Sequence, residues 1–286
     1  MKKLKYTFKT DTLFKMLFKK HQDLLKKLVA ELLRIRLEDI GDFEITNPEM
    51  PPESLEDKFC RLDINMKVNG QRVDLEIQVK DEGDFPERTM FHWAREYSSA
   101  LGSGRKYSEL PRVIIISIVA FPLFDCEEYH SEFQALEVSR HTPLTDRMSL
   151  HYFELPKLPE TISRDDRLLL WLSLFRANTE EELQEIEALE VPEMNQAITA
   201  YKRITVTKEF REMERLREKA RHDEASALYN AEMKGEARGK AEGKADIIKE
   251  MLKVNVPDNL VWQTAQNSGF TREQYEQIKR EFETQN

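Results

Sequence analysis

The chain has 286 residues, of which 40% are hydrophobic and 34% charged, and its formal net charge is -9. This length allows one sizeable core with an appended module, and there is no run of about 18 apolar residues that could span a membrane. Only two cysteines occur, so we expect no disulfide framework and a reducing, cytoplasmic location. The basic start has no apolar stretch behind it, and we therefore expect no secretory signal.

The charge is distributed unevenly along the chain. Residues 1–36 hold eleven Lys or Arg against three Asp or Glu, which gives this segment +8 and leaves -17 for the remainder. The overall sign argues against a protein that coats nucleic acid, because the phosphate backbone favours a positive surface. A local basic region can still hold nucleic acid.

The first third of the chain predicts a helix, a loop and a hairpin. Apolar residues at helical spacing predict one amphipathic helix from Thr10 to about Leu33. Prolines within residues 40–58 indicate a loop. Two alternating runs then flank Asn69-Gly70, a pair that predicts a tight β-hairpin because both residues tolerate the positive φ of a type I′ turn.

The central region completes an α/β core. A second helix is expected over residues 86–101, with its apolar side formed by Met90, Trp93, Ala94, Tyr97 and Leu101. The unbroken apolar run from Val113 to Phe121 is typical of a strand buried on both faces. Two strand-like runs, "EFQALEVSR" (132–140) and "SLHYFEL" (149–155), are expected to extend the edge of the sheet.

From Asp165 onward the pattern is helical. A buried-looking "RLLLWLSLF" and a glutamate-rich segment precede a long polar helix, expected from about Pro192 to Lys253. The last residues predict two short helices, the second opened by a capping box of Thr271 and Gln274. We therefore divide the chain into an α/β domain (1–160), a helical region with the long polar helix (161–253) and a small helical hairpin (254–286).

The long polar helix contains a repeat that spaces three glycines four residues apart, at Gly235, Gly239 and Gly243. A glycine in a helix interior costs about 1 kcal/mol relative to alanine. The stripe therefore indicates either a close helix contact in a homodimer or a hinge-like, solvated helix.

In the hairpin, paired positions add up to 139 around the Asn69-Gly70 turn. One face is then apolar, and we expect it to be the core side: Leu62, Ile64, Met66, Val73, Leu75, Ile77 and Val79. The other face carries Arg61, Asp63, Asn65, Lys67, Arg72, Asp74, Glu76 and Gln78. In this register Asp63 lies directly opposite Glu76.

Two directly opposed carboxylates have Cβ atoms about 4.5–5.5 Å apart and repel each other, so they need a cation or a shared proton. A divalent metal satisfies this need, and Mg²⁺ favours one or two carboxylates together with waters and substrate phosphate. Glu76 and Gln78 would then reach the metal and the attacking water together. Alternatively, the carboxylates pair with Arg61, Lys67 or Arg72 on an ordinary exposed sheet face.

Four ordered motifs resemble the Rpn family of recombination-promoting nucleases and transposases, a branch of the PD-(D/E)XK nuclease superfamily. They are "TDTLFKMLF", "LDI…VDLEIQVK", "FPERTMFHWAREYSSAL" and "GRKYSELPRVIIISI". The resemblance covers about residues 8–175 and extends to the variable C-terminal part. It implies metal-dependent endonuclease cleavage of DNA in recombination, mobile-element or phage-related processes. It also implies an αβββαβ core, with a mixed sheet flanked by helices, and a helical C-terminal region.

The resemblance implies roles for residues of the hairpin. Asp63 and Glu76 would bind Mg²⁺, with Mn²⁺ or Ca²⁺ as alternatives, and the carbonyl of Ile77 would be a further ligand. Gln78 replaces the lysine of the superfamily motif, so it can hold a water but cannot supply positive charge. Lys80, two residues further along the same face, could replace that charge.

Residues of the two helices are also implicated. Asp11 matches the acidic residue that helps to hold metal or water in the superfamily, although an aspartate at a helix start is also favoured as a cap and by the helix dipole. Lys15 lies one turn further on and would face the same site. Arg88, His92 and Arg95 share one helix face, where they either contact DNA phosphates or form solvated surface.

Two other functions stay open at the level of the sequence. A non-catalytic protein on a nuclease scaffold could bind a partner or regulate a related nuclease through its C-terminal helices, since fold does not secure activity. The glutamine at position 78 and the acidic overall charge favour this alternative. Transposase chemistry requires strand transfer as well as cutting, and nothing in these residues demonstrates it.

Overall fold

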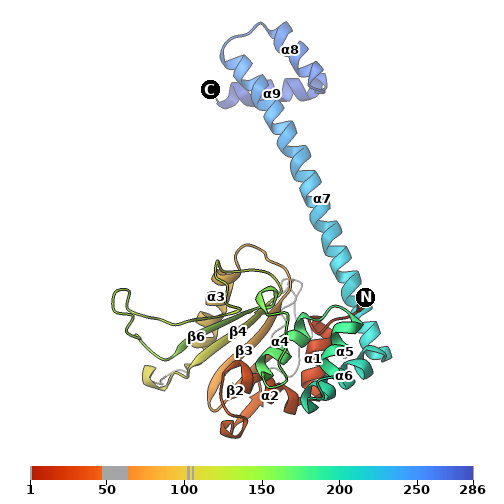
Figure 1. Ribbon diagram of the computed structural model, residues 1–286. Coiled ribbons are helices and arrows are strands. Elements are labelled where there is room, and N and C mark those ends of the chain that lie inside the picture. The colour runs from red at the N-terminus through yellow and green to blue at the C-terminus, as the bar shows by residue number, and fades with distance from the viewer. Residues whose placement is uncertain (1, 47–63, 102–103, 105, 286) are drawn as a thin grey trace. The chain divides into compact units, whose positions relative to one another are not determined.

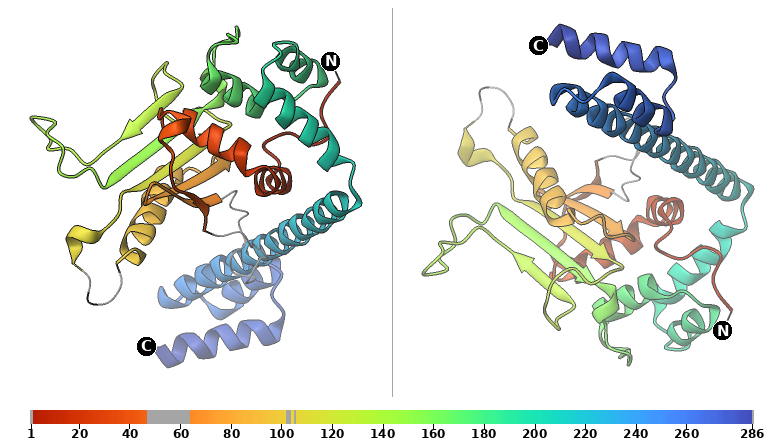
Figure 2. Two further views of the ribbon diagram at one scale, coloured as in Figure 1. Left: turned by 90° about the horizontal axis from the view of Figure 1, so that it is seen from below. Right: turned by 90° about the horizontal axis from the view of Figure 1, so that it is seen from above.

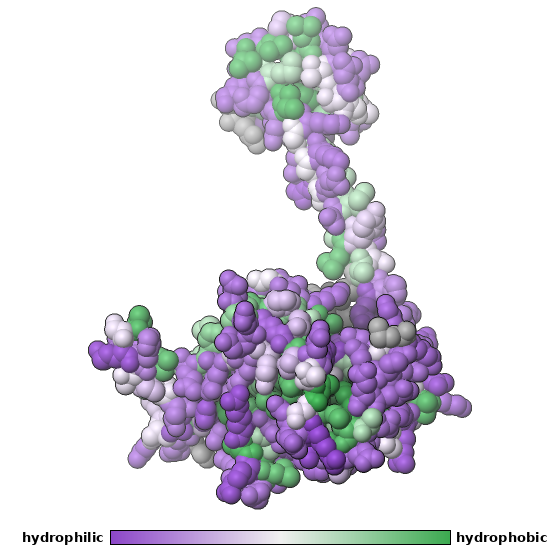
Figure 3. All heavy atoms as spheres, viewed as in Figure 1, coloured by the Kyte–Doolittle hydropathy of each residue, from purple (hydrophilic) through white to green (hydrophobic). Residues whose placement is uncertain are grey.

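The computed structural model describes residues 2–46, 64–101, 104 and 106–285. The chain forms two compact units, residues 1–214 and residues 215–286. The first unit contains an α/β fold and the second is helical. No helix within the described ranges is long and apolar enough to cross a membrane. Figure 3 shows a surface on which hydrophilic residues predominate in both units.

The described strands of the first unit form one mixed sheet in the order β1-β2-β3-β4-β6-β5 (Figure 1). The pairs β3–β4 and β4–β6 are parallel and the other pairs are antiparallel. The strands are β1 (Phe43–Ile45), β2 (Ile64–Val68), β3 (Gln71–Gln78), β4 (Val113–Val119), β5 (His130–Phe133) and β6 (Met148–Glu154).

Helices cover both faces of this sheet (Figures 1 and 2). One face is covered by α1 (Asp11–Lys20), α2 (Gln22–Leu32) and α4 (Arg167–Arg176), and α5 (Glu180–Glu187) and α6 (Pro192–Thr205) pack against these helices. The other face carries α3 (Phe85–Ser99). Short 3-10 turns occur at Leu37–Asp39, Tyr107–Glu109 and Leu155–Lys157.

The hairpin of β2 and β3 has the predicted register. Ile64 pairs with Leu75 and Met66 pairs with Val73. Asn69 and Gly70 both have positive φ, 50° and 75°, as the type I′ turn requires. The described apolar residues of the predicted core face are buried, except Val79, which is 48% exposed because β3 ends one residue before it. Leu62 lies outside the described residues.

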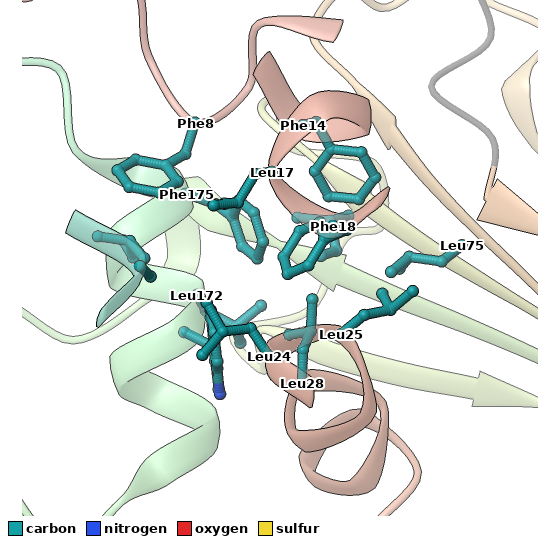
Figure 4. Packing of buried hydrophobic residues seen from close by; sticks show 14 of the residues in the cluster. Phe8, Phe14, Leu17, Phe18, Leu24, Leu25, Leu28, Leu75, Leu172 and Phe175 are labelled. Carbon is teal, nitrogen blue, oxygen red and sulfur yellow. The ribbon is translucent and has the colours of Figure 1, made fainter. Parts of the chain in front are cut away.

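The main core lies between the sheet and the helices α1, α2 and α4. Figure 4 shows side chains of these three helices and of β3 converging on one another. The labelled residues are Phe8, Phe14, Leu17, Phe18, Leu24, Leu25, Leu28, Leu75, Leu172 and Phe175. The "RLLLWLSLF" segment forms α4 and is buried as predicted, since a helix that is apolar all round needs partners on all sides.

The face under α3 has a smaller apolar core, which is centred on β4 and β6. It is formed by Phe85, Val113, Ile115, Val119, Leu150 and Tyr152. Polar contacts also hold α3 against the sheet. Arg72 Nη1 donates to Glu96 Oε2 at 3.1 Å and to Ser99 Oγ at 2.8 Å, and Trp93 Nε1 donates to the Val113 carbonyl at 3.1 Å.

The periodicity predicts a single N-terminal helix, and this prediction is wrong. The chain forms two helices, α1 and α2, with a break at His21. Residues 19–23 are all polar, so an unbroken helix would place a polar turn against the core. The break at φ -125° and ψ 69° lets both helices face the core. The His21 carbonyl still accepts from the Leu24 and Leu25 amides, which starts α2 directly.

The long polar helix is also divided, into α6 and α7 (Lys208–Lys253). Four consecutive β-branched residues, 204–207, stand at the break, and these residues lose side-chain freedom in a helix. Thr207 Oγ1 accepts from the Phe210 amide at 3.2 Å, as an N-cap does. The first part is therefore a core helix, and α7 alone carries the glycine stripe.

The two late strands extend the sheet beyond β4, as predicted, but their bounds differ. β6 pairs with β4 in parallel and lies between β4 and β5. β5 is the edge strand and ends at Phe133, so most of the "EFQALEVSR" run is not a strand. The segment beyond it makes an isolated bridge between Leu136 and Pro143. Short apolar runs reveal a strand but not its neighbours, so the sequence pattern did not predict the order of β5 and β6.

The second unit closes around α8 (Asp258–Asn267), α9 (Arg272–Gln285) and the end of α7. Its core is formed by Ile248, Val261, Ala265, Tyr275 and Ile278. The predicted capping box is confirmed, since Thr271 N donates to Gln274 Oε1 at 2.9 Å and Gln274 N donates to Thr271 Oγ1 at 3.3 Å. A Cβ added at any glycine of the stripe would meet no described atom within 4 Å, and the homodimer stays a prediction.

A chain of hydrogen bonds joins β5 to β6. Ser149 Oγ donates to Glu132 Oε1 at 2.9 Å, because a carboxylate only accepts. His151 Nε2 must then donate to Ser149 Oγ at 2.9 Å, which leaves Nδ1 of the neutral ring as an acceptor. His130 Nε2 then donates to this Nδ1 at 3.1 Å. A second proton on His151 would set two N–H groups against each other.

Burial lowers the pKa of His151 from 6.5 to about 4; Glu132 raises it, and His130, Arg112 and Arg34 lower it further. Well above pH 6.5 the His151 ring is neutral in both the folded and the unfolded chain. The stabilisation that the neutral ring gives the folded chain is then fully present. As the pH falls below 6.5 the unfolded chain binds the proton first. The free energy of unfolding therefore decreases until about pH 4.

We predict that this histidine contributes on the order of 3 kcal/mol to the loss of unfolding free energy between pH 7 and pH 4. Chemical denaturation of the wild type and of His151→Leu at several pH values measures it. The variant should lose less stability over this range than the wild type. Substituting the exposed His222 with Gln is the control and should leave the pH dependence unchanged. Equal slopes for the wild type and His151→Leu would contradict the prediction.

Candidate active site

Four polar side chains of β3 lie on the sheet face that α3 covers. They are Arg72, Asp74, Glu76 and Gln78, which alternate with the residues of the main core. Glu76 is the most enclosed of them at 6% exposure, and the other three are half-buried. A carboxylate so deep in a sheet needs hydrogen-bond donors or a cation around it.

A buried hydroxyl of the neighbouring strand meets Glu76. Ser117 of β4 is fully buried, and its Oγ donates to Glu76 Oε1 at 2.7 Å. The parallel registers align Glu76 with Ser117 and Ser117 with Tyr152 of β6. These three residues form one row across the centre of the sheet.

The buried residues of α3 are Phe85, Thr89 and His92, and Trp93 and Tyr97 pack half-buried against the smaller core. The prediction that His92 shares a face with Arg88 and Arg95 opposite the buried side is therefore wrong, because the His92 ring is 8% exposed. The predicted apolar side is confirmed in part, since Trp93 and Tyr97 pack against the core whereas Met90 is exposed. The surface beneath the helix is partly polar, and polar residues of α3 turn toward it.

Tyr152 adds a neutral hydroxyl to this row. Burial raises the pKa of Tyr152 to about 12, the Thr89 hydroxyl opposes this in part, and the carboxylates of Glu76 and Glu87 raise it further. The phenol therefore stays protonated at neutral pH. It adds no second negative charge beside Glu76.

Gln78 and Lys80 lie at the end of β3. The amide Nε2 of Gln78 donates to the Lys80 carbonyl at 2.9 Å. Since a backbone carbonyl only accepts, this bond fixes which end of the amide points there. The Lys80 side chain is exposed, and no ion pair of it occurs among the described residues.

Asp11 and Lys15 form an ion pair on α1. Lys15 Nζ lies 3.0 Å from Asp11 Oδ1, and Asp11 is buried. Asp11 is the first residue of α1, and the N-cap position belongs to Thr10, so the cap interpretation of Asp11 is wrong. The helix dipole still favours a carboxylate there.

The two arginines of α3 differ in their surroundings. Arg88 Nη1 lies 2.6 Å from Glu82 Oε2, and the guanidinium stacks over the Phe85 ring at 5.0 Å. Arg95 is exposed. The geometry therefore leaves Arg95 more accessible than Arg88 to an external anion.

A pocket of about 270 Å³ opens on the same sheet face. Its polar lining includes Asn65 of β2, Arg72 and Asp74 of β3, and Glu96 of α3. Asn65 and Asp74 are directly paired across the hairpin. The polar surface of the hairpin thus continues from Glu76 into a concave region beside α3.

The donor chemistry of this face fits a hard divalent cation, because Glu76 presents carboxylate oxygens of the kind that Mg²⁺ prefers. Within the described ranges no three His, Cys, Asp or Glu side chains converge as a metal-binding group. Asp63, the predicted second carboxylate, lies outside the described residues. The Ile77 side chain is buried in the main core and has no atom that could bind a metal. Only the backbone carbonyl of Ile77 could therefore serve as a ligand.

Sequence reasoning missed Ser117, Thr89 and Tyr152 as parts of this site. A signal existed for Ser117, because it is the single polar residue in the run from Val113 to Phe121. A hydroxyl in a strand buried on both faces needs a partner. No comparable signal marks Thr89 or Tyr152, whose roles depend on how α3 and β6 pack.

Comparison with known proteins gives one finding for this chain. A family model described as PD-(D/E)XK nuclease family transposase matches residues 8–231, more than three quarters of the sequence. The matched range includes the whole sheet, α3 and the core helices. Searches of curated proteins and of solved structures gave no match.

Proposed function

Since the chain belongs to the PD-(D/E)XK nuclease family of transposases, we propose that it is a metal-dependent endonuclease that hydrolyses phosphodiester bonds of DNA. The family supports a nuclease-like or transposase-related role, and the mixed sheet flanked by helices is the expected αβββαβ fold. The observation that carries the finer proposal is the buried Glu76 carboxylate on the polar sheet face. Processes of recombination, mobile elements or phage are the proposed context.

In this proposal the hairpin holds the metal. The pairing rule that the described part of the hairpin obeys predicts Asp63 opposite Glu76. These two carboxylates, with the Ile77 carbonyl, would hold Mg²⁺ or Mn²⁺, and Asp11 would support the group from α1. When bound, the cation lowers the pKa of a coordinated water and stabilises charge on the phosphorus under attack. Glu76 binds and orients it through a fixed carboxylate.

Exposed cations near the end of β3 and on α3 would hold the DNA backbone. Lys80 and Arg95 are exposed, whereas Lys15 and Arg88 each have an acidic partner. An ion-paired cation gives up that partner when it binds a phosphate, which reduces its net gain. We therefore propose Lys80 and Arg95 as the stronger phosphate contacts.

The first prediction concerns the two carboxylates. Asp63→Ala and Glu76→Ala should each lower cleavage by more than about 100-fold, since loss of a direct ligand exceeds the effect of its outer partners. The fold should persist, because removing one opposed carboxylate relieves repulsion. Nicking of supercoiled plasmid with Mg²⁺ measures this, and EDTA should reproduce the loss. Glu127→Ala, at an exposed position, is the control. Cleavage at the wild-type rate by either variant would remove that residue from the site.

The second prediction compares two lysines of the hairpin region. Lys80→Ala should weaken DNA binding and reduce the slope of log affinity against log salt by about 1, as expected for one phosphate contact. Lys67 is the matched control, because its ammonium lies 3.7 Å from Glu44 and it projects from a different strand. Fluorescence anisotropy with a duplex oligonucleotide in Ca²⁺ gives both slopes. Equal effects of Lys67→Ala and Lys80→Ala would argue against Lys80.

A second function is favoured by one observation, the glutamine at position 78. A protein without the motif lysine could keep the fold and bind a partner without cutting DNA. The response of the protein to a divalent metal distinguishes a nuclease from a non-catalytic scaffold. A chain that shows neither thermal stabilisation by Mg²⁺ or Mn²⁺ nor plasmid nicking would be a scaffold rather than a nuclease.

A further inference from the structure

Ser117 is the one hydroxyl in a strand that is otherwise aliphatic. Every residue of β4 is buried, and Ser117 has no measurable exposure. A serine there gives up the apolar burial that a valine or isoleucine would contribute. Its hydroxyl is used in the hydrogen bond to Glu76, at 2.7 Å.

The position of this hydroxyl is set by the centre of the sheet. β4 has parallel neighbours on both sides, β3 and β6, so its backbone has little freedom to move. The register aligns Ser117 with Glu76 itself, and the two side chains emerge on the same face. Ser117 therefore donates from a fixed point, while the longer glutamate side chain has three rotatable bonds.

The Ser117 bond occupies one acceptor position of the carboxylate. An ionised carboxylate offers about four lone-pair sites on its two oxygens. The short bond from Ser117 to Oε1 favours one orientation of the Glu76 carboxylate. Tyr152, the next residue of the row, is neutral and does not compete as an anion.

We propose that Ser117 is a positioning residue that fixes the Glu76 carboxylate for a divalent cation. This inference rests on the proposed function, because it assumes that Glu76 is a metal ligand. Groups that orient a metal ligand typically account for 10–100-fold in metal affinity or activity. Ser117 would act in this way although it touches neither metal nor DNA.

The test uses a pair of variants that differ only in the hydroxyl. Ser117→Thr and Ser117→Val place side chains of nearly the same shape in the strand, and threonine alone can donate to Glu76. Thermal stabilisation by Mn²⁺ and by Mg²⁺ is measured for each folded variant as a function of metal concentration. The same variants are assayed for plasmid nicking across the same range.

We expect Ser117→Val to need about 10–100-fold more metal than Ser117→Thr in both measurements, with Ser117→Thr close to the wild type. A purely structural role would lower the melting temperature without changing the metal concentration at half-saturation. Equal metal dependence of the two variants would overturn the inference. Ser173→Ala is a control for loss of a buried hydroxyl, because the Ser173 hydroxyl has no hydrogen-bond partner among the described residues.

Glu76→Gln separates this inference from the proposed function. If Glu76→Gln loses metal binding while Ser117→Val and Ser117→Thr behave alike, Glu76 is a ligand and Ser117 does not position it. If Glu76→Gln binds metal as the wild type does, the assignment of Glu76 itself is wrong. If either Ser117 variant fails to fold, Ser117→Ala and Ser117→Cys replace the pair, since alanine removes the donor and cysteine keeps a weak one.

Discussion

Strand β3 carries the constraint on which the rest of the first unit depends, because its two faces need opposite surroundings. Val73, Leu75 and Ile77 require apolar packing, which α1, α2 and α4 provide. The other face holds a nearly buried carboxylate, which is unfavourable unless donors or a cation surround it. The parallel pairing with β4 meets this second need by bringing Ser117 to Glu76. A slip of one residue would move the carboxylate into the aliphatic core.

The face under α3 is divided, and that division locates the site. Over β4 and β6 the helix packs on apolar side chains such as Ile115 and Leu150. Toward β3 it is held by Arg72, which bonds to two residues near the end of α3. The apolar contacts that hold α3 against the sheet thus lie over β4 and β6. The hairpin side stays polar and concave, as a site for a charged ligand requires.

Local signals in the sequence predicted most of the helices and strands. The buried side of α3 and the order of the strands depend on tertiary contacts. The Asn69-Gly70 turn determined the hairpin register, since turn geometry and side-chain alternation act over a few residues. The inner side of α3 could be predicted only in part, because an apolar stripe marks the buried side only when the covered surface is apolar. Trp93 and Tyr97 pack against the core as the stripe predicts, but Thr89 and His92 are also buried and Met90 is exposed. The place of β6 beside β4 likewise depends on long-range pairing that no local pattern records.

In the proposed nuclease site, the glutamine at position 78 would change the role of this position rather than merely weaken it. Its Nε2 donates to the Lys80 carbonyl, so the side-chain oxygen is the end left to face a water. An amide oxygen accepts a hydrogen bond from a water, whereas a lysine ammonium can only donate one. The residue would therefore orient the water without adding charge. If the proposed site uses a positive charge, it would come from another residue. The same hydrogen bond holds the backbone from which the exposed Lys80 side chain projects.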